Sequence, residues 1–140
     1  MSKLFEMETT HTTYLGDLRT EAKHVKSGEI LITDAPPDNQ GKGESFSPTD
    51  LLATSLGSCM LTIMGIAART HNINMDGTKI KVTKVMAANP RRVSEVHVIF
   101  DMPENNYTDK EKAILENAAR TCPVALSVHP DLKQVLVFNY

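Results

Sequence analysis

The feature that most constrains this 140-residue chain is an uncharged stretch from residue 51 to residue 68. Its apolar side chains recur so often that, on a helix, they cover every side rather than one stripe. A helix that is apolar all round has to be buried all round. One sheet and one further helix of so short a chain can hardly cover it, so we predict that a second copy of the chain does, in a homodimer.

A membrane span is the alternative interpretation of this stretch, because a span requires roughly 18 residues. Small polar residues interrupt the stretch, however, and no aromatic or basic anchors frame it. The net charge is −2, with acidic and basic residues intermixed, which favours neither a polybasic membrane patch nor a nucleic-acid footprint. We therefore expect no membrane and no nucleic-acid partner, but a small molecule or another protein.

Length and composition predict a single domain over residues 1–140, since 41% hydrophobic residues suffice for one core and no segment has linker composition. The N-terminus lacks the apolar core and cleavage site of a signal peptide, which predicts a cytoplasmic protein. Structural disulfides are rare in that reducing compartment, so Cys59 and Cys122 invite a chemical explanation. Inert burial is the competing explanation, because free cysteine is among the most buried residue types.

Alternating apolar and polar residues predict strands on both sides of the apolar stretch. They span residues 3–14, 18–26, 29–33, 79–88, 93–102 and 134–140. The first pair encloses a turn at Leu15, Gly16 and Asp17, and the pair 79–88 and 93–102 reads as an antiparallel hairpin. Residues 34–47 are dense in Pro, Gly, Asn and Asp, which predicts a loop.

Two helices have clear start signals. Ser47 as N-cap, with Pro48 at the first helical position and Asp50 three residues after the cap, predicts a helix over residues 48–70. A second capping box, Thr108 with Glu111, opens a helix through Arg120. Its inner face would consist of Ile114, Leu115, Ala118 and Ala119. Strands and helices in this order indicate an α+β domain.

The surroundings of the two cysteines favour chemistry. Cys59 has small neighbours, Gly57, Ser58 and Thr62, which leave room for a substrate or a second chain. Burial alone would keep its thiol protonated, so reactivity requires a cation or hydrogen-bond donors from elsewhere in the fold. Cys122 precedes Pro123 and would cap a short helix, whose N–H groups and positive dipole end favour a thiolate.

The segments SPTDLLATSLGSCM and TCPVA, in this order, resemble the OsmC/Ohr (organic hydroperoxide resistance) family over essentially the whole chain. The matching positions are Pro48, Leu51, Leu52, Gly57, Ser58 and Cys59, then Cys122, Pro123 and Val124. The resemblance implies antiparallel sheets around a long buried central helix, in an intertwined homodimer with active sites at the subunit interface. This dimer agrees with the one inferred from the apolar helix.

The resemblance also implies a reaction. Cys59 would attack the O–O bond of an organic hydroperoxide, Cys122 would resolve the resulting sulfenic acid as a disulfide, and a dithiol would restore both thiols. Family hydroperoxidases add an arginine from the N-terminal hairpin, for which Arg19 is the candidate here, and a glutamate directly after the helix-opening proline. Thr49 occupies the glutamate position, and the acid Asp50 follows one residue later, turned by about 100 degrees around the helix.

Plainer roles compete with these assignments. Arg19 could be a solvated hairpin residue, Asp50 could simply close the capping box, and His129 before Pro130 fits a surface turn better than a proton donor. Met60 and Met64 fit core filler better than a substrate pocket. No zinc spacing or phosphate-binding loop is present, so we expect no metal and no other cofactor.

Three functions remain open from sequence. The first is the thiol-dependent peroxide reductase. The second is a non-peroxidatic relative that senses redox state or binds a small apolar ligand. The third is a purely structural protein in which both cysteines only pack.

Overall fold

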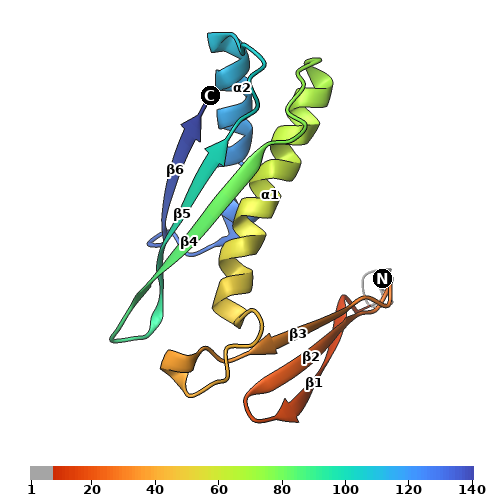
Figure 1. Cartoon of the computed structure of the whole chain (residues 1–140), viewed down its shortest axis with the longest axis vertical. Helices are drawn as coiled ribbons and strands as arrows, with labels where there is room; N and C mark the ends of the chain where they lie inside the picture. Colours follow the sequence, from red (N-terminus) through yellow and green to blue (C-terminus); the bar gives the residue numbers. More distant parts are fainter. Residues whose placement is uncertain (1–7) are drawn as a thin grey trace, which may run out of the picture. The chain divides into compact units, whose positions relative to one another are not determined.

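The computed structural model describes residues 8–140, and the chain separates into two compact units, residues 1–51 and 52–140 (Figure 1). The N-terminal unit holds strands β1 (Thr10–Gly16), β2 (Arg19–His24) and β3 (Ile30–Asp34). Helix α1 (Pro48–Thr70) begins at its end and continues into the C-terminal unit. Two small sheets and a central helix make this an α+β protein, as predicted.

The N-terminal sheet is antiparallel in the order β1-β2-β3. Asp17 and Leu18 both have positive φ, the backbone of a tight turn whose twist matches the strands. The predicted hairpin is confirmed, although residues 3–7 of its first strand lie outside the described part. Within the predicted loop, a 3₁₀ helix forms at Pro37–Asn39, which the loop prediction did not include.

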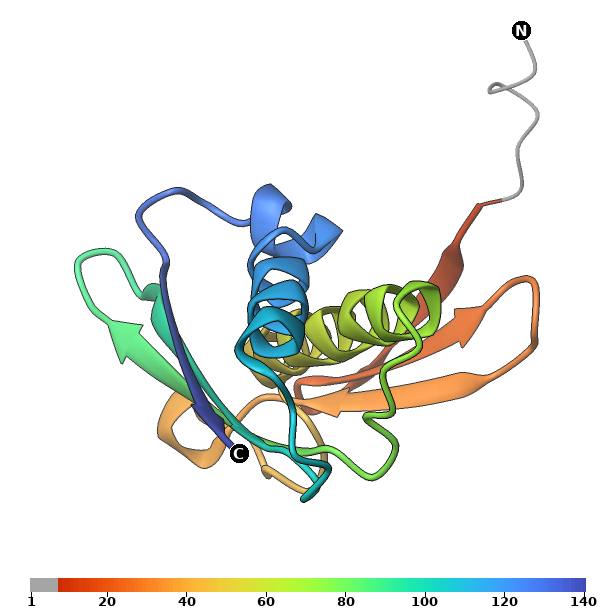
Figure 2. The ribbon, with the colours of Figure 1, turned by 90° about the horizontal axis from the view of Figure 1, so that it is seen from above.

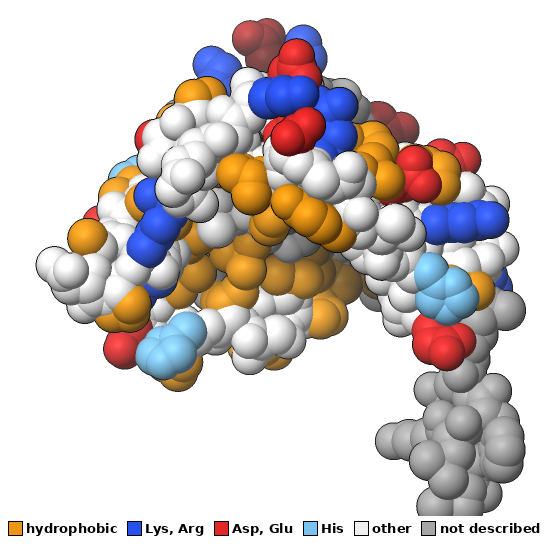
Figure 3. All heavy atoms as spheres, turned by 90° about the horizontal axis from the view of Figure 1, so that it is seen from below, with side chains coloured by type: hydrophobic (Ala, Val, Ile, Leu, Met, Phe, Trp, Pro, Cys, Tyr) orange, Lys and Arg blue, Asp and Glu red, His pale blue; other side chains and the backbone are white. Residues whose placement is uncertain are grey.

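This sheet has no apolar core of its own among the described residues. Its buried side chains are polar, and every buried apolar side chain of residues 8–140 belongs to the C-terminal unit. Large apolar side chains of the strands and their turns are exposed instead: Tyr14, Leu15, Leu18, Ile30 and Leu31. Figure 3 shows one face of the molecule, on which hydrophobic side chains reach the surface. A three-stranded sheet needs apolar packing on one face to be stable, so this one requires cover.

The C-terminal sheet consists of β4 (Lys79–Ala87), β5 (Arg92–Asp101) and β6 (Lys133–Asn139), in that order. The hairpin β4–β5 is antiparallel, as predicted, but β6 runs parallel to β5. The expectation of purely antiparallel sheets was therefore wrong. The physical reason is the connection, because it carries two helices across the sheet and brings the chain back in the same direction.

The connecting helices are α2 (Asp109–Arg120) and α3 (Pro123–Ser127). Thr108 caps α2 in the predicted capping box with Glu111, and Cys122 caps α3, as expected. Figure 2 shows α1 and α2 on the same side of the sheet. On β5, every second side chain points to these helices and is fully buried, namely Val96, Val98 and Phe100.

Helix α1 contributes one buried face to this core. The buried positions recur every three or four residues, at Ala53, Leu56, Gly57, Met60, Met64 and Ala68. Leu52 and Ile66, on other sides of the helix, remain 39% and 56% exposed. By length and composition alone the helix could cross a membrane, but it packs as a core helix against the sheet. As expected, the chain's own residues do not bury every side of the helix.

Gly57 marks the closest approach of α1 to the sheet. A Cβ placed on this glycine would lie 2.8 Å from Ile80 Cδ1 and 3.0 Å from Val82 Cγ2 on β4. Such distances are shorter than van der Waals contact, so a larger residue would require the helix or the side chains of Ile80 and Val82 to shift. Cys59 lies two residues further along, and its position depends on this contact.

We expect Gly57→Ala to destabilise the protein. Overpacking costs about 1–3 kcal/mol, which outweighs the roughly 1 kcal/mol that alanine gains in helix propensity. Gly65→Ala is the matched control, because a Cβ at Gly65 meets nothing within 4 Å in this chain. It should stabilise by up to about 1 kcal/mol. Urea unfolding of both variants measures the difference, and equal effects would contradict the close approach at Gly57.

Candidate active site

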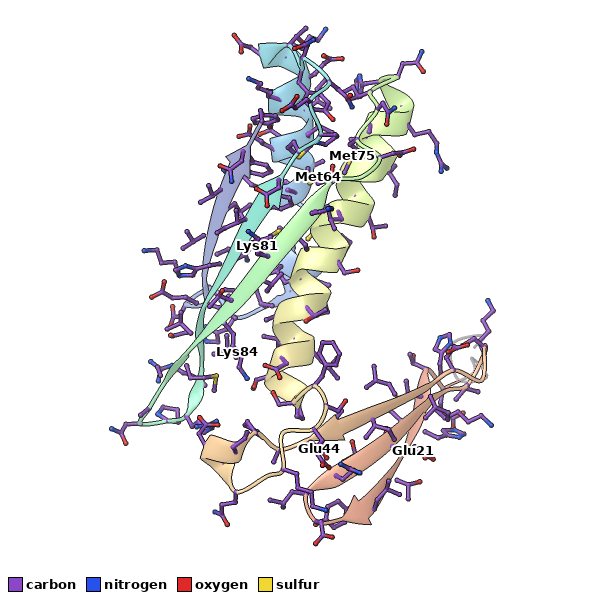
Figure 4. The ribbon with its side chains drawn as sticks, in the orientation of Figure 1. Glu21, Glu44, Met64, Met75, Lys81 and Lys84 are labelled. Carbon is purple, nitrogen blue, oxygen red and sulfur yellow. The ribbon has the colours of Figure 1, made fainter. Side chains whose placement is uncertain are left out.

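Cys59 lies in the middle of α1 and is half-buried, packed against the edge of the core. Met60 and Met64 beside it are fully buried (Met64 is labelled in Figure 4). They therefore fill the core, as the plainer interpretation had it. Of the two thiols, Cys59 is the one that a molecule from solvent can reach.

Cys122 is fully buried at the start of α3. Its backbone is extended, as an N-cap requires, and its Sγ accepts a hydrogen bond from the Ala125 N–H at 3.4 Å. Burial raises the pKa of the Cys122 thiol above its ordinary value, and the N–H groups of Ala125 and Val124 oppose this only partly. In the reduced protein Cys122 is therefore held as a thiol.

The structure brings the two cysteines together. The nearby Cys59 side chain raises the pKa of Cys122 further, so the two side chains lie near each other. Both are free, without a disulfide. Cys59 belongs to α1 and Cys122 is the N-cap of α3, and no sequence spacing between them indicates that they are neighbours.

Arg19 opens β2 in the N-terminal unit, directly opposite Asp34 on β3. Its Nε donates to Asp34 Oδ1 at 2.7 Å, and its Nη2 donates to Asp34 Oδ2 at 3.0 Å and to Glu44 Oε1 at 2.7 Å. Figure 4 shows Glu44 on the loop that follows β3. The Asp34 side chain is only 2% exposed, so Arg19 belongs to a built ion-pair cluster and not to a solvated hairpin.

Electrostatics within this cluster favour the charged forms. The hydrogen bonds and charge of Arg19 hold the pKa of the Asp34 carboxyl below its ordinary value, although burial alone would raise it. A hydrogen bond from the Glu44 N–H to Asp34 at 3.1 Å adds to this effect. In return, Asp34 and Glu44 raise the pKa of the Arg19 guanidinium. Arg19 is thus fixed in place as a cation.

Sequence reasoning did not identify Asp34 as a site residue. The predicted third strand stopped at residue 33, one residue short, whereas β3 extends to Asp34. Residues of opposite charge that face each other on neighbouring strands stabilise a sheet. The register of β2 against β3 would therefore have identified Asp34 as the partner of Arg19. No sequence motif indicates the contact of Glu44 with Arg19, because an irregular loop brings Glu44 there.

Asp50 and Ser47 form the predicted capping box. The Asp50 N–H donates to Ser47 Oγ at 3.0 Å, and the Ser47 N–H donates to Asp50 Oδ2 at 2.9 Å. Thr49, at the position of the family glutamate, has its hydroxyl 3.1 Å from that of Ser47. The catalytic role predicted for Asp50 stays a prediction, whereas its capping role is confirmed.

The remaining candidates lie apart from this chemistry. His129 is exposed, and its Nδ1 accepts a hydrogen bond from the Asp131 N–H, as in a surface turn. Among residues 8–140, no group of three or more His, Cys, Asp or Glu side chains is arranged to hold a metal ion.

The lowered pKa of Asp34 predicts that the N-terminal sheet loses stability in acid. A carboxyl whose folded pKa is depressed stabilises the fold above its unfolded pKa, about 3.9 for aspartate, and this contribution disappears as the pH falls through the folded pKa. Hydrogen exchange of the β2 and β3 amides, corrected for intrinsic rates, should therefore accelerate below about pH 4. Asp34→Asn should already exchange faster at neutral pH and show little further acid dependence. Glu44→Gln removes the more exposed partner and should have the smaller effect; an equal effect would contradict the central place of Asp34.

Comparison with known protein families gives one match. The family model described as OsmC-like protein matches residues 41–134, which include both cysteines and the central helix. No curated protein sequence matches significantly.

Solved structures extend the similarity to nearly the whole chain. A protein from Psychrobacter arcticus 273-4, provisionally described as an osmotic stress induced and detoxification response protein, is 58% identical, with a TM-score of 0.91 and coverage of 96% of this chain and 97% of the other. An organic hydroperoxide resistance protein OsmC from Legionella pneumophila shares the fold at 15% identity, with a TM-score of 0.75 and coverage of 96% and 99%. A Vibrio cholerae protein, provisionally described as an organic hydroperoxide resistance protein with captopril bound in one of its active sites, does so at 14% identity, with a TM-score of 0.74 and coverage of 96% and 93%. By the family match and the Psychrobacter relative, this chain belongs to the OsmC/Ohr family of OsmC-like proteins.

Proposed function

We propose that the protein is a thiol-dependent peroxide reductase that acts on organic hydroperoxides, with Cys59 as the attacking thiol and Cys122 as the resolving thiol. The observation that carries this proposal is the proximity of two free cysteines in unequal surroundings. Cys59 can be reached from solvent, whereas Cys122 is buried and held protonated. This asymmetry supports attack by Cys59 and resolution by Cys122.

The reaction balances with these two residues and one external dithiol. The Cys59 thiolate attacks the terminal oxygen of ROOH, the O–O bond breaks, and the alkoxide takes a proton and leaves as ROH. Cys59 is then a sulfenic acid. The Cys122 sulfur attacks the Cys59 sulfur, its proton and the sulfenic hydroxyl leave as water, and a disulfide forms. A dithiol reduces this disulfide by two successive exchanges and is itself oxidised to a disulfide.

The substrate class is proposed from family membership. Family relatives from Legionella pneumophila and Vibrio cholerae are described as organic hydroperoxide resistance proteins, the latter provisionally. The much more similar Psychrobacter protein is provisionally described in terms of osmotic stress and detoxification. Both descriptions are compatible with removal of reactive peroxides.

Arg19 is our proposed cation for the Cys59 thiolate. The bonds to Asp34 and Glu44 use its Nε and Nη2, and within residues 8–140 they leave the N–H groups of Nη1 without a hydrogen-bond partner. Planar guanidinium groups fixed in this way present directed donors to an anion. We propose that Asp34 and Glu44 hold Arg19 in place. In the family hydroperoxidases a glutamate does this, and Thr49 stands at its position here.

A homodimer is part of the same proposal. Among residues 8–140 the N-terminal sheet buries no apolar side chain, and α1 leaves apolar side chains such as Leu52 and Ile66 exposed. Exposed apolar surface over several elements is typical of an interface between subunits. The family resemblance independently implies such a dimer.

Steady-state peroxidase assays test the reaction. The reduced protein should consume cumene hydroperoxide with a dithiol faster than it consumes hydrogen peroxide. Cys59→Ser should lower the turnover by about a thousandfold or more, because the nucleophile is lost. Cys122→Ser should yield one equivalent of alcohol per protein and then stop, since no disulfide can form. Mass spectrometry should find a Cys59–Cys122 disulfide only in the wild-type protein.

Full activity in both cysteine variants would contradict the mechanism. If the wild-type thiols are inert to both peroxides, the second function, redox sensing or binding of a small apolar ligand without turnover, becomes the better explanation.

Sedimentation at micromolar concentration tests the dimer. We expect a single species of twice the chain mass. Ile66→Glu places a charge on the exposed side of α1 and should shift the protein towards monomers, because a buried unpaired charge is strongly unfavourable. Lys133→Glu, an exposed charge reversal on β6, is the control and should leave the dimer intact. A wild-type monomer would refute the dimer but not the thiol chemistry.

A further inference from the structure

Gln134 is an amide on the apolar face of the C-terminal sheet. It alternates along β6 with Leu136 and Phe138, and these three residues pair in register with Val96, Val98 and Phe100, which are all fully buried. Phe138 stacks on Phe100 with ring centroids 4.4 Å apart, so this is the side that packs in the core. A polar group at such a position is unfavourable unless it is hydrogen-bonded.

The amide of Gln134 has a specific partner in α3. Its Nε2 donates to the carbonyl oxygen of Ala125 at 3.0 Å. Helix α3 has only five residues and ends at Ser127, so the Ala125 carbonyl lies in the last turn, where a helix supplies no N–H of its own. Gln134 thus anchors a short helix to the sheet at the point where that helix would otherwise fray.

Ala125 also holds the resolving thiol. Its N–H donates to Cys122 Sγ at 3.4 Å, while its carbonyl accepts from Gln134. Ala125 is itself buried, so one fixed residue connects the sheet to the sulfur of Cys122. Displacement of α3 would therefore move the thiol that has to meet Cys59.

We propose that Gln134 is a positioning residue for the resolving step: by anchoring Ala125 it holds Cys122 Sγ against Cys59. This inference rests on the proposed function for its biological meaning, but not for its test. Gln134 touches neither the peroxide nor the reacting sulfurs. Its loss should slow disulfide formation and leave the attack of Cys59 on an electrophile unchanged.

One consequence concerns oxidative damage. A Cys59 sulfenic acid that waits longer for Cys122 is exposed to a second peroxide, which oxidises it to the sulfinic acid. Variants without the anchor should therefore accumulate sulfinic Cys59 at peroxide concentrations that the wild-type protein tolerates.

The resolving step can be measured without any peroxide. One equivalent of dithiobis(nitrobenzoate) converts the reachable Cys59 into a mixed disulfide with thionitrobenzoate. The Cys122 thiolate then attacks the Cys59 sulfur, the Cys59–Cys122 disulfide forms, and thionitrobenzoate leaves as a coloured thiolate. Thionitrobenzoate is thus released in two phases, first on loading of Cys59 and then on disulfide formation. Cys122→Ser should show only the first phase, which establishes that the second phase reports Cys122.

Gln134→Met keeps the length of the side chain and removes the donor. We expect its second phase to be about tenfold slower than that of the wild-type protein, in line with the sensitivity of such steps to small displacements, with the loading phase unchanged. Asn139→Ala is the matched control, because it removes an amide hydrogen bond from the far end of the same strand, to Asp101. It should leave both phases unchanged.

Gln134→Glu makes the second-phase rate depend on pH, which a merely structural role of Gln134 would not do. Its carboxylate cannot donate to the Ala125 carbonyl, whereas its protonated form can. The ratio of its second-phase rate to that of the wild-type protein should therefore be low at neutral pH and rise as the carboxyl becomes protonated. This variant also replaces Gln134→Met if that protein does not fold.

A second phase as fast in a folded Gln134 variant as in the wild-type protein would overturn the inference, as would equal slowing of both phases or a flat pH ratio in Gln134→Glu. Absence of peroxide turnover in the wild-type protein would refute the proposed function alone, because the mixed-disulfide assay is independent of it.

Discussion

The close contact between α1 and the β4-β5-β6 sheet is the constraint on which the rest of the C-terminal unit depends. Gly57 lets the helix backbone approach β4, and Met60 and Met64 fill the space behind it. Full burial of one such side chain contributes about 1.5–3 kcal/mol. This packing fixes the rotation of the helix about its axis, and that rotation turns Cys59 towards Cys122 at the border of the core.

The two thiols differ because their backbones differ. Cys59 belongs to a helix interior, where the N–H groups around it are already bonded, and it must obtain a stabilising donor from another part of the protein. Cys122 lies ahead of a helix start, and the Ala125 N–H is free to reach its sulfur. Burial nevertheless raises the Cys122 pKa. A thiol that stays protonated in the reduced protein suits the resolving role better than the attacking role, because attack requires a thiolate.

Sequence patterns predicted the helices well, because their signals are local. Ser47 with Asp50, and Thr108 with Glu111, form the capping boxes that mark both starts. The parallel pairing of β6 and the neighbourhood of the cysteines depend on how α2 and α3 cross the sheet, and no local pattern encodes that path. The exposed side of α1 differs again, since its apolar residues were recognised from the sequence, whereas Leu52 and Ile66 stay exposed among the described residues.

The charge balance around Arg19 limits how this residue can act on a thiolate. Two carboxylates, Asp34 and Glu44, accept its hydrogen bonds, so the cluster carries no net positive charge at neutral pH. Long-range attraction for an anion is therefore weak, and any stabilisation has to come from the directed N–H groups of Nη1 at short range. In the proposed mechanism such a donor acts only on a thiolate placed within hydrogen-bond distance, which would make reactivity depend on how the N-terminal hairpin is held. The exposed apolar side chains of the N-terminal sheet and the proposed role of Arg19 thus pose one structural problem, which the proposed assembly of two chains would solve.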